Sequence, residues 1–449
     1  MNKPVSSSQV FDIREIFPYL ANFHNQKFVI SADINLLLSQ NSSLLEDIVL
    51  LAVCGIRIIL IPDELKLVTN LSNSTDKNQI VINEKSWNVL YQQLAMRHFQ
   101  IIANLNLTLR KYQSEKISIA SNIYIRAKPR GVANGIDLGR NGKVRGIDTA
   151  VLKHDLLAKQ IILIPAISPS PTGKLYWLAV EELAENLAIA LEVNKWIVIA
   201  KSTISSFFSN ELLAFFNQQQ YLKGKNLKNN IPSEITIDQL KDTLQHIKSS
   251  LPLFDSIIST INNGVERVNI IAYDEDLNRN NLLQELFTHK GCGTVISTHS
   301  LDVFRKATTD DVGGIWSIIY PLEENGFLRP RSTADIEKLI NSFFVITHDG
   351  LIIATAALIP IKDQKNAAEF AAFAVAPVHQ KRGIGKKLLA EVLLFAKHQK
   401  INKIYLLTIH AYEWFKENGF QFVKEKNLPH SKQLEYDQCR KAKIMLKKL

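Results

Sequence analysis

Short apolar runs alternate with longer amphipathic stretches over the first two-thirds of the chain. The runs are rich in Ile and Val, which is typical of strands buried on both faces of a parallel sheet. The expected strands are Lys27–Ile30, Ile56–Ile61, Ile161–Ile164, Trp196–Ala200 and Arg267–Ala272. The expected helices are Ser43–Cys54, Trp87–Arg97, Val180–Glu192, Ile237–Ser250 and Asn281–Phe287. This alternation predicts an α/β domain with a mostly parallel sheet, and the polar stretch Tyr221–Ser233 is expected to be an exposed loop.

A new pattern begins near His299–Arg305, so we expect two domains, formed by residues 10–299 and 300–449. The expected strands of the second domain are Val303–Lys306, Phe343–Thr347, Leu351–Pro360, Ala368–Val375, Lys403–Thr408 and Ala442–Leu446. Its expected helices are Asp310–Glu324, Thr333–Ser342, Gly383–Gln399 and Ala411–Asn418. Thr309 or Asp310 is expected to cap the first of these helices, and the pair Asp349-Gly350 predicts a hairpin turn.

The composition narrows the range of partners. The chain has 449 residues, of which 46% are apolar and 21% charged, as in a packed globular protein. The net charge of +10 suits an anionic ligand, whereas nucleic acid is not expected without finger spacing or a basic stripe interleaved with aromatics. The three cysteines, Cys54, Cys292 and Cys439, have no metal spacing, so we expect free thiols, no metal and a cytoplasmic protein. The apolar run Ile48–Ile61 contains Arg57 and is too short to cross a membrane.

The strongest chemical signal is the turn formed by Gln380, Lys381, Arg382, Gly383, Ile384 and Gly385. It follows an expected strand and opens an amphipathic helix, whose N-terminus presents unpaired amides and a partial positive charge. The two glycines let a phosphate approach the backbone, and Lys386 adds positive charge beside them. The alternative is a glycine-rich turn that only starts a helix. The order of strand, proline, basic turn and helix favours a pyrophosphate site.

This arrangement resembles the GNAT acetyltransferase family, whose acetyl-CoA signature is Gln/Arg-x-x-Gly-x-Gly/Ala. The resemblance implies a mixed α+β fold and acetyl-CoA as the co-substrate. It also implies that the backbone amides of Phe373, Ala374 and Val375 bind the pantetheine arm and the thioester carbonyl. Residues 414–420 match the family's late helix and Gly-Phe turn. Many members carry a Tyr general acid where this chain has Phe415, so the proton for the CoA thiolate must come from another group.

Nearly the whole chain resembles the bacterial N-acetylglutamate synthase family, in which an amino-acid-kinase-like domain precedes a GNAT domain. The matching strings include Gly291-Cys292-Gly293-Thr294, Asp311-Val312-Gly313-Gly314, Glu413-Trp414-Phe415 and Leu428-Pro429. The resemblance implies acetyl transfer to L-glutamate in the first step of arginine biosynthesis. It assigns the two substrate carboxylates to Arg331 and Arg440, with Lys441 as an alternative to Arg440, since Arg is the preferred fork for a carboxylate. It also implies acceptor contacts from Ala372 and Leu407.

The acceptor amine must lose a proton before it attacks the thioester, and the family places a base at Glu369. Strand alternation predicts that Glu369 shares one face with Ala371, Phe373 and Val375. A poorly solvated carboxylate is suited to accept a proton, directly or through water; the alternative is a Glu whose head reaches solvent. Thr408 ends the next strand, where it either donates to the leaving sulfur or holds the substrate. Backbone amides of residues 373–375 are expected to stabilise the oxyanion.

Amino-acid kinases hold the ATP phosphates with a Lys and paired glycines after the first strand. Residues 30–34 have neither, and Pro62-Asp63-Glu64 replaces the next glycine run, so we expect no phosphotransfer. In the synthases this domain binds arginine, and by resemblance Glu285, Gly291 and Gly293 belong to the arginine site. The resemblance also implies a homo-oligomer, often a hexamer.

Two other functions remain open: a GNAT enzyme for another amine, and a non-catalytic arginine sensor. The pair Arg331 and Arg440 argues against a lysine acceptor. The intact turn at residues 380–385 argues against a decayed enzyme.

Overall fold

The computed structural model divides the chain into two compact units, Met1–Ser300 and Leu301–Leu449. It describes residues 19–40, 42–72, 80–112, 117–158, 161–201, 227–228, 231–247, 251–273, 281–287, 292–299, 302–348, 350–381, 383–434, 436, 440 and 442–449. Gly291, Asp349, Arg382, Cys439 and Lys441, which the sequence singles out, lie outside these residues. Within them, no helix is long and apolar enough to span a bilayer.

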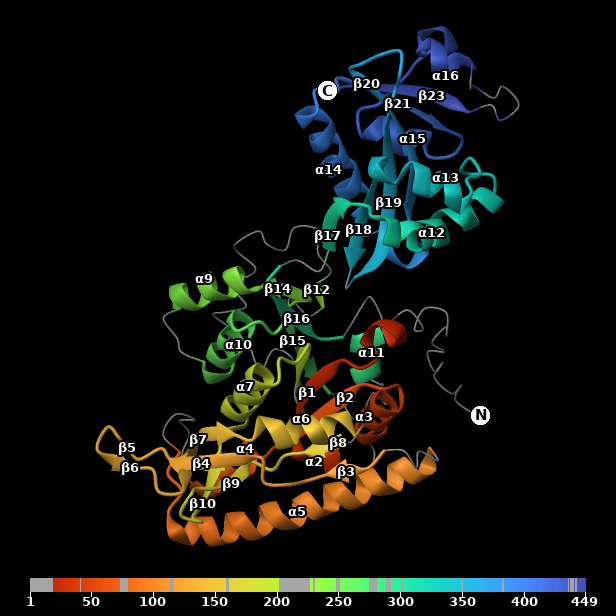
Figure 1. Cartoon of the computed structure of the whole chain (residues 1–449). Helices are drawn as coiled ribbons and strands as arrows, with labels where there is room; N and C mark the ends of the chain where they lie inside the picture. Colours follow the sequence, from red (N-terminus) through yellow and green to blue (C-terminus); the bar gives the residue numbers. More distant parts are fainter. Residues whose placement is uncertain are drawn as a thin grey trace, which may run out of the picture. The chain divides into compact units, whose positions relative to one another are not determined.

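The front unit is built on an eight-stranded sheet (Figure 1). Its strands, in sheet order, are β14 (Glu234–Thr236), β16 (Thr294–Ser297), β15 (Arg267–Ala272), β11 (Lys195–Ala200), β1 (Lys27–Asp33), β2 (Arg57–Asp63), β8 (Ile161–Leu163) and β3 (Ile119–Ala120). Neighbouring strands run parallel except β15 and β16, which are antiparallel. The predicted α/β class and the five predicted strands of this sheet are therefore confirmed.

Among the helices of the front unit, α3 contacts both α5 and α11, and α7 contacts α10. The helices are α2 (Ile34–Leu38), α3 (Leu44–Val53), α4 (Leu65–Ser72), α5 (Glu84–Lys111), α6 (Thr149–Leu157), α7 (Val180–Ala190), α9 (Ile237–Ile247), α10 (Pro252–Asn262) and α11 (Asn281–Phe287). The predicted end of α5 at Arg97 is wrong. Ile101, Leu105 and Leu109 continue the buried stripe, so tertiary packing outweighs the weak helix propensity of the Asn and Thr residues between them.

Smaller sheets complete the front unit. One has the order β4 (Ile125–Pro129), β7 (Asn141–Ile147), β10 (Leu175–Leu178) and β9 (Ile167–Pro169). Two-stranded pairs are formed by β5 (Val132–Ala133) with β6 (Ile136–Asp137), and by β12 (Leu227–Lys228) with β13 (Ile231–Pro232). The last pair falls within the predicted loop Tyr221–Ser233, so the described part of that stretch is a short β-ribbon instead.

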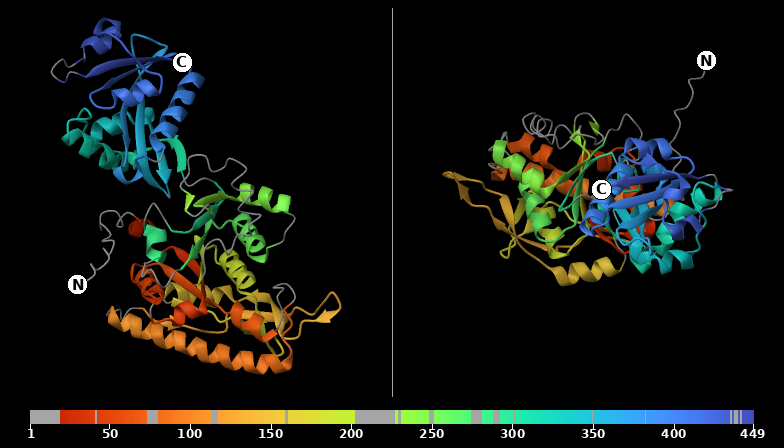
Figure 2. Two further views of the ribbon diagram at one scale, coloured as in Figure 1. Left: turned by 180° about the vertical axis from the view of Figure 1, so that it is seen from behind. Right: turned by 90° about the horizontal axis from the view of Figure 1, so that it is seen from above.

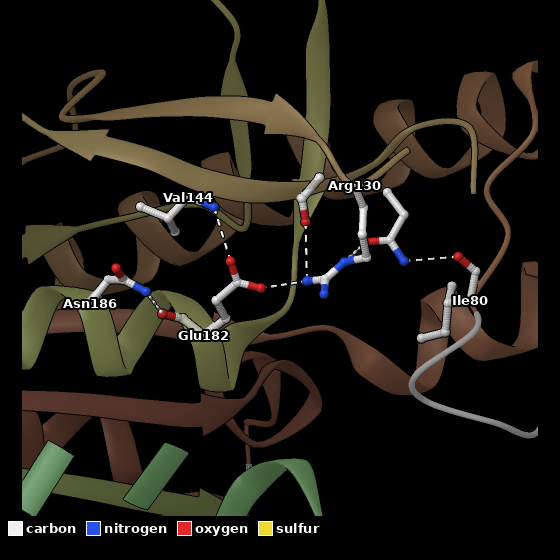
Figure 3. A network of polar contacts seen from close by, with 7 residues as sticks. Ile80, Arg130, Val144, Glu182 and Asn186 are labelled. Atoms are coloured by element: carbon white, nitrogen blue, oxygen red, sulfur yellow. Dashed lines mark hydrogen bonds and ion pairs between the residues drawn. The ribbon is translucent and has the colours of Figure 1, made fainter. Parts of the chain in front are cut away.

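A polar network joins the four-stranded sheet to α7 (Figure 3). Glu182 of α7 accepts a hydrogen bond from the Val144 amide at 3.1 Å and forms an ion pair with Arg130. Arg130 Nε donates to Asn141 Oδ1 at 3.1 Å, and Asn141 Nδ2 donates to the Ile80 carbonyl at 2.8 Å. Because these polar groups bind one another, the network holds β4 and β7 against the helix.

The second unit has a seven-stranded sheet. Its strands, in sheet order, are β17 (Asp302–Lys306), β18 (Phe343–His348), β19 (Leu351–Pro360), β20 (Ala367–Val375), β21 (Lys403–Thr408), β23 (Lys443–Lys448) and β22 (Gln421–Phe422). All neighbours are antiparallel except β20 and β21, which are parallel. This mixed sheet confirms the predicted α+β class of the second unit.

Helices cover both faces of this sheet, as Figures 1 and 2 show from opposite sides. The helices are α12 (Val312–Glu324), α13 (Thr333–Lys338), α14 (Ile384–His398), α15 (Tyr412–Glu417) and α16 (His430–Leu434). The α12 and α13 side chains pack on one face with Phe343, Val345 and Ala374, while α14 and α15 pack on the other with Phe344 and Phe370. The predicted helix Thr333–Ser342 is broken, because a separate 3-10 turn, Ile340–Ser342, follows α13.

The predicted cap of α12 is also wrong. A 3-10 turn, Thr309–Asp311, precedes α12, and the N-cap of α12 is Asp311, without a side-chain cap hydrogen bond. The capping box belongs to the 3-10 turn: its N-cap is Thr308, whose amide donates to Asp311 Oδ2 at 2.7 Å. Arg305 donates to both Asp311 oxygens, at 2.6 and 2.8 Å. These contacts lower the pKa of Asp311 to about 2. The cap was misplaced because the bidentate Arg305 pair, which fixes Asp311 as the cap partner, is not visible in the local sequence.

Candidate active site

The two parallel strands at the centre of the second unit part from each other. They pair only from Ala367↔Lys403 to Glu369↔Tyr405. Beyond this point β21 pairs with β23 alone, through Leu406, Leu407 and Thr408. On the side of β21, the backbone of residues 370–375 therefore faces an opening, while its other side pairs with β19. The amides that point into the opening are available to a ligand.

A β-bulge lies where the strands part. Ala372 has φ +49°, and the register with β19 shifts between Thr355 and Ala357. The extra residue reverses the alternation, so Phe373 and Val375 pack with the α14 face whereas Ala372 and Ala374 pack with the α12 face. Glu369 pairs with Ile359 across the ladder, on the α12 side. The prediction that Glu369 shares a face with Phe373 and Val375 is therefore wrong, since alternation does not continue through a bulge.

A cavity of about 620 Å³ opens between the parted strands. Its lining includes residues 370–375 of β20, residues 406–408 of β21, and Gln380, Lys381, Gly383, Gly385 and Lys386 of the basic turn. The structure thus brings together every described residue predicted to contact acetyl-CoA except Ile384. The Ile384 side chain is buried in the core beneath α14, so it anchors the turn.

The basic turn has a backbone suited to an anion. Gly383 caps α14 with φ +80° and has no atom within 4 Å of an added Cβ. Lys381 also has a positive φ, +61°. Gln380 Nε2 donates to the Val375 carbonyl at 3.1 Å, which ties the turn to the end of β20. The N-terminal amides of α14 and the exposed lysine therefore face the solvent side of the turn, where a pyrophosphate can approach.

Gly385 has a second role, in packing. A Cβ at this position would lie 3.2 Å from Phe373 Cζ and 3.6 Å from Val375 Cγ2. The Phe373 ring in turn stacks on Trp414, with centroids 5.3 Å apart and planes at 22°. The glycine thus lets the helix approach the strand whose backbone faces the cavity.

We expect Gly385→Val to weaken acetyl-CoA binding by about tenfold, or about 1.4 kcal/mol, because overpacking displaces Phe373 and the adjoining backbone. Calorimetric titration of the full chain measures this change. Gly313→Val is the matched control, since Gly313 is an exposed helical glycine with no atom within 4 Å of an added Cβ. Equal acetyl-CoA affinity in both variants would contradict the assignment of this turn.

A second cavity, of about 710 Å³, adjoins the first. Both are lined by Phe370, Ala371, Ala372 and Leu407. The second cavity is lined by the predicted acceptor residues Arg331, Arg440 and Glu369. The structure therefore places the predicted base and both predicted carboxylate ligands around one space, which meets the acetyl-CoA cavity at the bulge.

The charged side chains of this second cavity are held by local contacts. Arg331 donates to the Arg329 carbonyl at 3.0 Å, and Arg440 donates to the Gly326 carbonyl at 3.2 Å. Burial lowers the pKa of Arg331, and the nearby Glu369 acts in the opposite direction. The guanidinium stays charged, because the ordinary pKa of arginine lies far above neutrality. Two guanidinium groups are thus available for an acceptor with two carboxylates.

Sequence reasoning did not identify Lys432 as a site residue. Lys432 Nζ lies 2.6 Å from Glu369 Oε2, and the two side chains are 17% and 18% exposed. The predicted base, Glu369, is therefore partly buried in an ion pair, rather than isolated in apolar surroundings or fully solvated. The distance between these residues in the sequence leaves no local signal for the pair.

Thr408 and Phe415 line the acetyl-CoA cavity. Thr408 Oγ1 accepts a hydrogen bond from the Ala411 amide at 3.2 Å, which leaves its hydroxyl proton able to donate. The Phe415 ring is buried against Phe373 and has no proton to give. His379, also in the lining, is neutral at pH 7, because burial lowers its pKa to about 4.

In the front unit, the carboxylate of Glu285 binds its own chain. It accepts hydrogen bonds from the Cys292 and Gly293 amides at 2.7 and 2.8 Å, and from Asn269 Nδ2 at 2.7 Å. A Cβ at Gly293 would lie 2.3 Å from the Ile270 carbonyl oxygen, so only glycine fits there. Glu285 and Gly293 therefore lie together, with the carboxylate supporting the turn.

Comparison with known proteins agrees with this geometry. The profile of the family described as Acetyltransferase (GNAT) domain matches residues 340–422. The amino-acid acetyltransferase of Haemophilus ducreyi is 32% identical over 445 residues, covering 96% of this chain and 97% of that protein. That of Pectobacterium atrosepticum is 31% identical and covers 99% of both chains. The N-acetylglutamate synthase of Neisseria gonorrhoeae, complexed with coenzyme A and L-arginine, superposes with a TM-score of 0.78 at 26% identity, covering 99% of this chain and 100% of that one.

The parted strands, the basic turn and the GNAT match define the second unit as an acetyl-CoA-dependent acetyltransferase of the GNAT class. The full-length similarity is more specific: this chain belongs to the amino-acid acetyltransferase family.

Proposed function

We propose that this protein transfers the acetyl group of acetyl-CoA to the α-amine of L-glutamate, the first step of arginine biosynthesis. The observation that carries the proposal is the cavity in which Arg331, Arg440 and Glu369 meet beside the acetyl-CoA cavity. Its charges suit an acceptor with two carboxylates and one amine. The same Neisseria gonorrhoeae synthase has also been solved with coenzyme A and N-acetyl-glutamate, at a TM-score of 0.56 and 27% identity.

In the proposed reaction, Arg331 and Arg440 each bind one carboxylate of glutamate. Glu369 takes a proton from the ammonium group, directly or through water, and the neutral amine attacks the thioester carbonyl. Backbone amides at the bulge, around Ala372 and Phe373, stabilise the oxyanion that develops. The C–N bond forms, the attacking nitrogen loses its second proton to solvent, the C–S bond breaks, and CoA leaves as a thiolate.

The departing thiolate needs a proton that Phe415 cannot supply. We assign stabilisation of the thiolate to Thr408, which lines the same cavity. Its hydroxyl would donate a hydrogen bond to the leaving sulfur. A hydroxyl is a weak acid, so its contribution is to stabilise the sulfur while a proton arrives from solvent.

An acceptor screen tests the proposed substrate. Release of free CoA thiol is followed with acetyl-CoA and a panel of amino acids, polyamines and lysine peptides. Glutamate should give the highest kcat/KM, and aspartate, which is one methylene shorter, should be discriminated against by roughly tenfold or more. A lysine peptide as the best acceptor would refute the proposal.

For the front unit we propose a regulatory role without phosphotransfer. β1 and β2 end at Asp33 and Asp63, and Glu64 follows Asp63; carboxylates repel phosphate. Burial raises the pKa of Glu64. We further propose a cytoplasmic homo-oligomer, a hexamer by family resemblance. Cys54 is a free thiol.

We also propose that L-arginine is an effector of this protein, as it is bound by the Neisseria gonorrhoeae synthase. Adding millimolar arginine to the full chain should change the glutamate saturation curve. Glu285→Ala should remove the response, because the turn at Cys292 and Gly293 loses its two hydrogen bonds to the carboxylate, while activity without arginine stays near normal. If arginine does not change the glutamate saturation curve of the native enzyme, the proposed regulation is wrong and the front unit has a structural role only.

A further inference from the structure

The contact between Lys432 and Glu369 joins two distant parts of the chain inside the acceptor cavity. Lys432 lies on α16, whereas Glu369 lies on β20. Nζ and Oε2 are 2.6 Å apart, and each side chain is less than one-fifth exposed. An ion pair at this depth costs desolvation and adds little net stability compared with apolar packing. Because the pair adds little stability and includes the proposed base, we expect its role to be in catalysis.

The short helix that carries Lys432 is fixed to the strand pair that carries Glu369. The Ser431 amide donates to Asp363 Oδ2 at 2.9 Å, and the Ser431 hydroxyl donates to the other oxygen of the same carboxylate. Asp363 lies in the connection between β19 and β20. Gln433 Nε2 also donates to the Leu428 carbonyl, at 2.7 Å. The ammonium group and the base are thus held by one local framework.

Resting on the proposed function, we propose that Lys432 is a positioning residue that orients the Glu369 carboxylate toward the acceptor amine. The ion pair restrains the direction of the carboxylate. The Lys432 charge also disfavours an ammonium group next to it, so the incoming amine is driven toward its neutral, nucleophilic form. Arg331 and Arg440 bind the substrate carboxylates. Lys432 is therefore not needed as a carboxylate ligand and assists the removal of a proton from the acceptor ammonium group.

Other charged and titratable groups face Glu369 in the same cavity. They are Arg329, Arg331, Asp335, Lys362, Tyr436 and Arg440. Asp335 is engaged in the capping box of α13, where it accepts hydrogen bonds from Ser332. Among the described residues, Lys432 is the cation that lies within ion-pair distance of Glu369.

The test compares Lys432→Met with Lys432→Arg in the full-length enzyme. In Lys432→Met, kcat at neutral pH should fall about tenfold, and the acidic limb of the kcat profile should move up by about one pH unit. The direction follows because the bound acceptor amine must be neutral to attack, and it loses the neighbouring cation that disfavours its ammonium form. KM for glutamate and the affinity for acetyl-CoA should change little. Lys432→Arg should restore most of the rate and the wild-type pH profile, and the exposed Lys424→Met is the control.

An unchanged pH profile in Lys432→Met would overturn the inference. A large rise in the glutamate KM with a wild-type kcat would also overturn it, since Lys432 would then be a substrate ligand. A loss of acetyl-CoA affinity in both Lys432 variants would indicate a structural role only. If the wild type acetylates a different amine, the glutamate assignment fails, and the same pH comparison is made with that amine, because deprotonation by Glu369 is needed for either acceptor.

Discussion

Replacing Glu369 by Gln should lower kcat by about a hundredfold to ten-thousandfold. The amide keeps the shape of the side chain but cannot take the proton from the acceptor ammonium. KM for glutamate should change much less, because Arg331 and Arg440 still bind the carboxylates. Activity should recover in part at high pH, where a larger fraction of the amine is already neutral. Steady-state rates between pH 6 and 10 measure this effect.

Glu417→Gln, an exposed change on α15 outside both cavities, is the control for the loss of a carboxylate. A Glu369→Gln enzyme with wild-type kcat at neutral pH would mean that another group accepts the proton. A kcat that stays depressed by the same factor at high pH would instead assign Glu369 to substrate positioning.

The second large effect concerns the acceptor carboxylates. Arg331→Ala and Arg440→Ala should each raise KM for glutamate by about 10-fold to about 150-fold, which corresponds to about 1.5–3 kcal/mol for a hydrogen bond to a charged group. KM for acetyl-CoA should stay near the wild-type value, since neither arginine lines the acetyl-CoA cavity. Initial rates with glutamate varied at saturating acetyl-CoA give both constants.

Arg331→Lys separates charge from geometry, because lysine keeps the charge but loses the fork. We expect an intermediate KM for this variant. Lys338→Ala, an exposed cation on the adjacent α13, should leave KM unchanged. Wild-type KM in both alanine variants would contradict the acceptor assignment.

The acetyl-CoA turn could be predicted from the sequence because it is local. A strand, a proline, the glycines Gly383 and Gly385 and an amphipathic helix follow one another without a break, and each signal has its own physical cause. The parallel sheet of the front unit could be predicted for the same reason, from runs of Ile and Val between helical stretches. Both elements could be predicted because each is encoded by residues that are consecutive in the sequence.

Features that depend on distant partners could not be predicted. The bulge at Ala372 leaves no mark in the sequence, because alanine has no preference for a positive φ, and it reversed the expected face of Phe373. The helix α5 continues beyond Arg97 because its apolar stripe is buried against the rest of the front unit. Lys432 and Arg305 both make ion pairs whose importance appears only when the chain is folded.

The proposed reaction of this protein is acetyl transfer from acetyl-CoA to the α-amine of glutamate, and its product can be identified directly. Purified full-length protein is incubated with [acetyl-¹³C₂]acetyl-CoA and L-glutamate, and the products are identified by mass spectrometry with fragmentation. We expect N-acetylglutamate that carries the doubly ¹³C-labelled acetyl group on its α-nitrogen, formed together with an equal amount of free CoA, and at least about a hundredfold less product from Glu369→Gln at neutral pH over the same time. Release of CoA without labelled N-acetylglutamate, or label on a different amine, would contradict it.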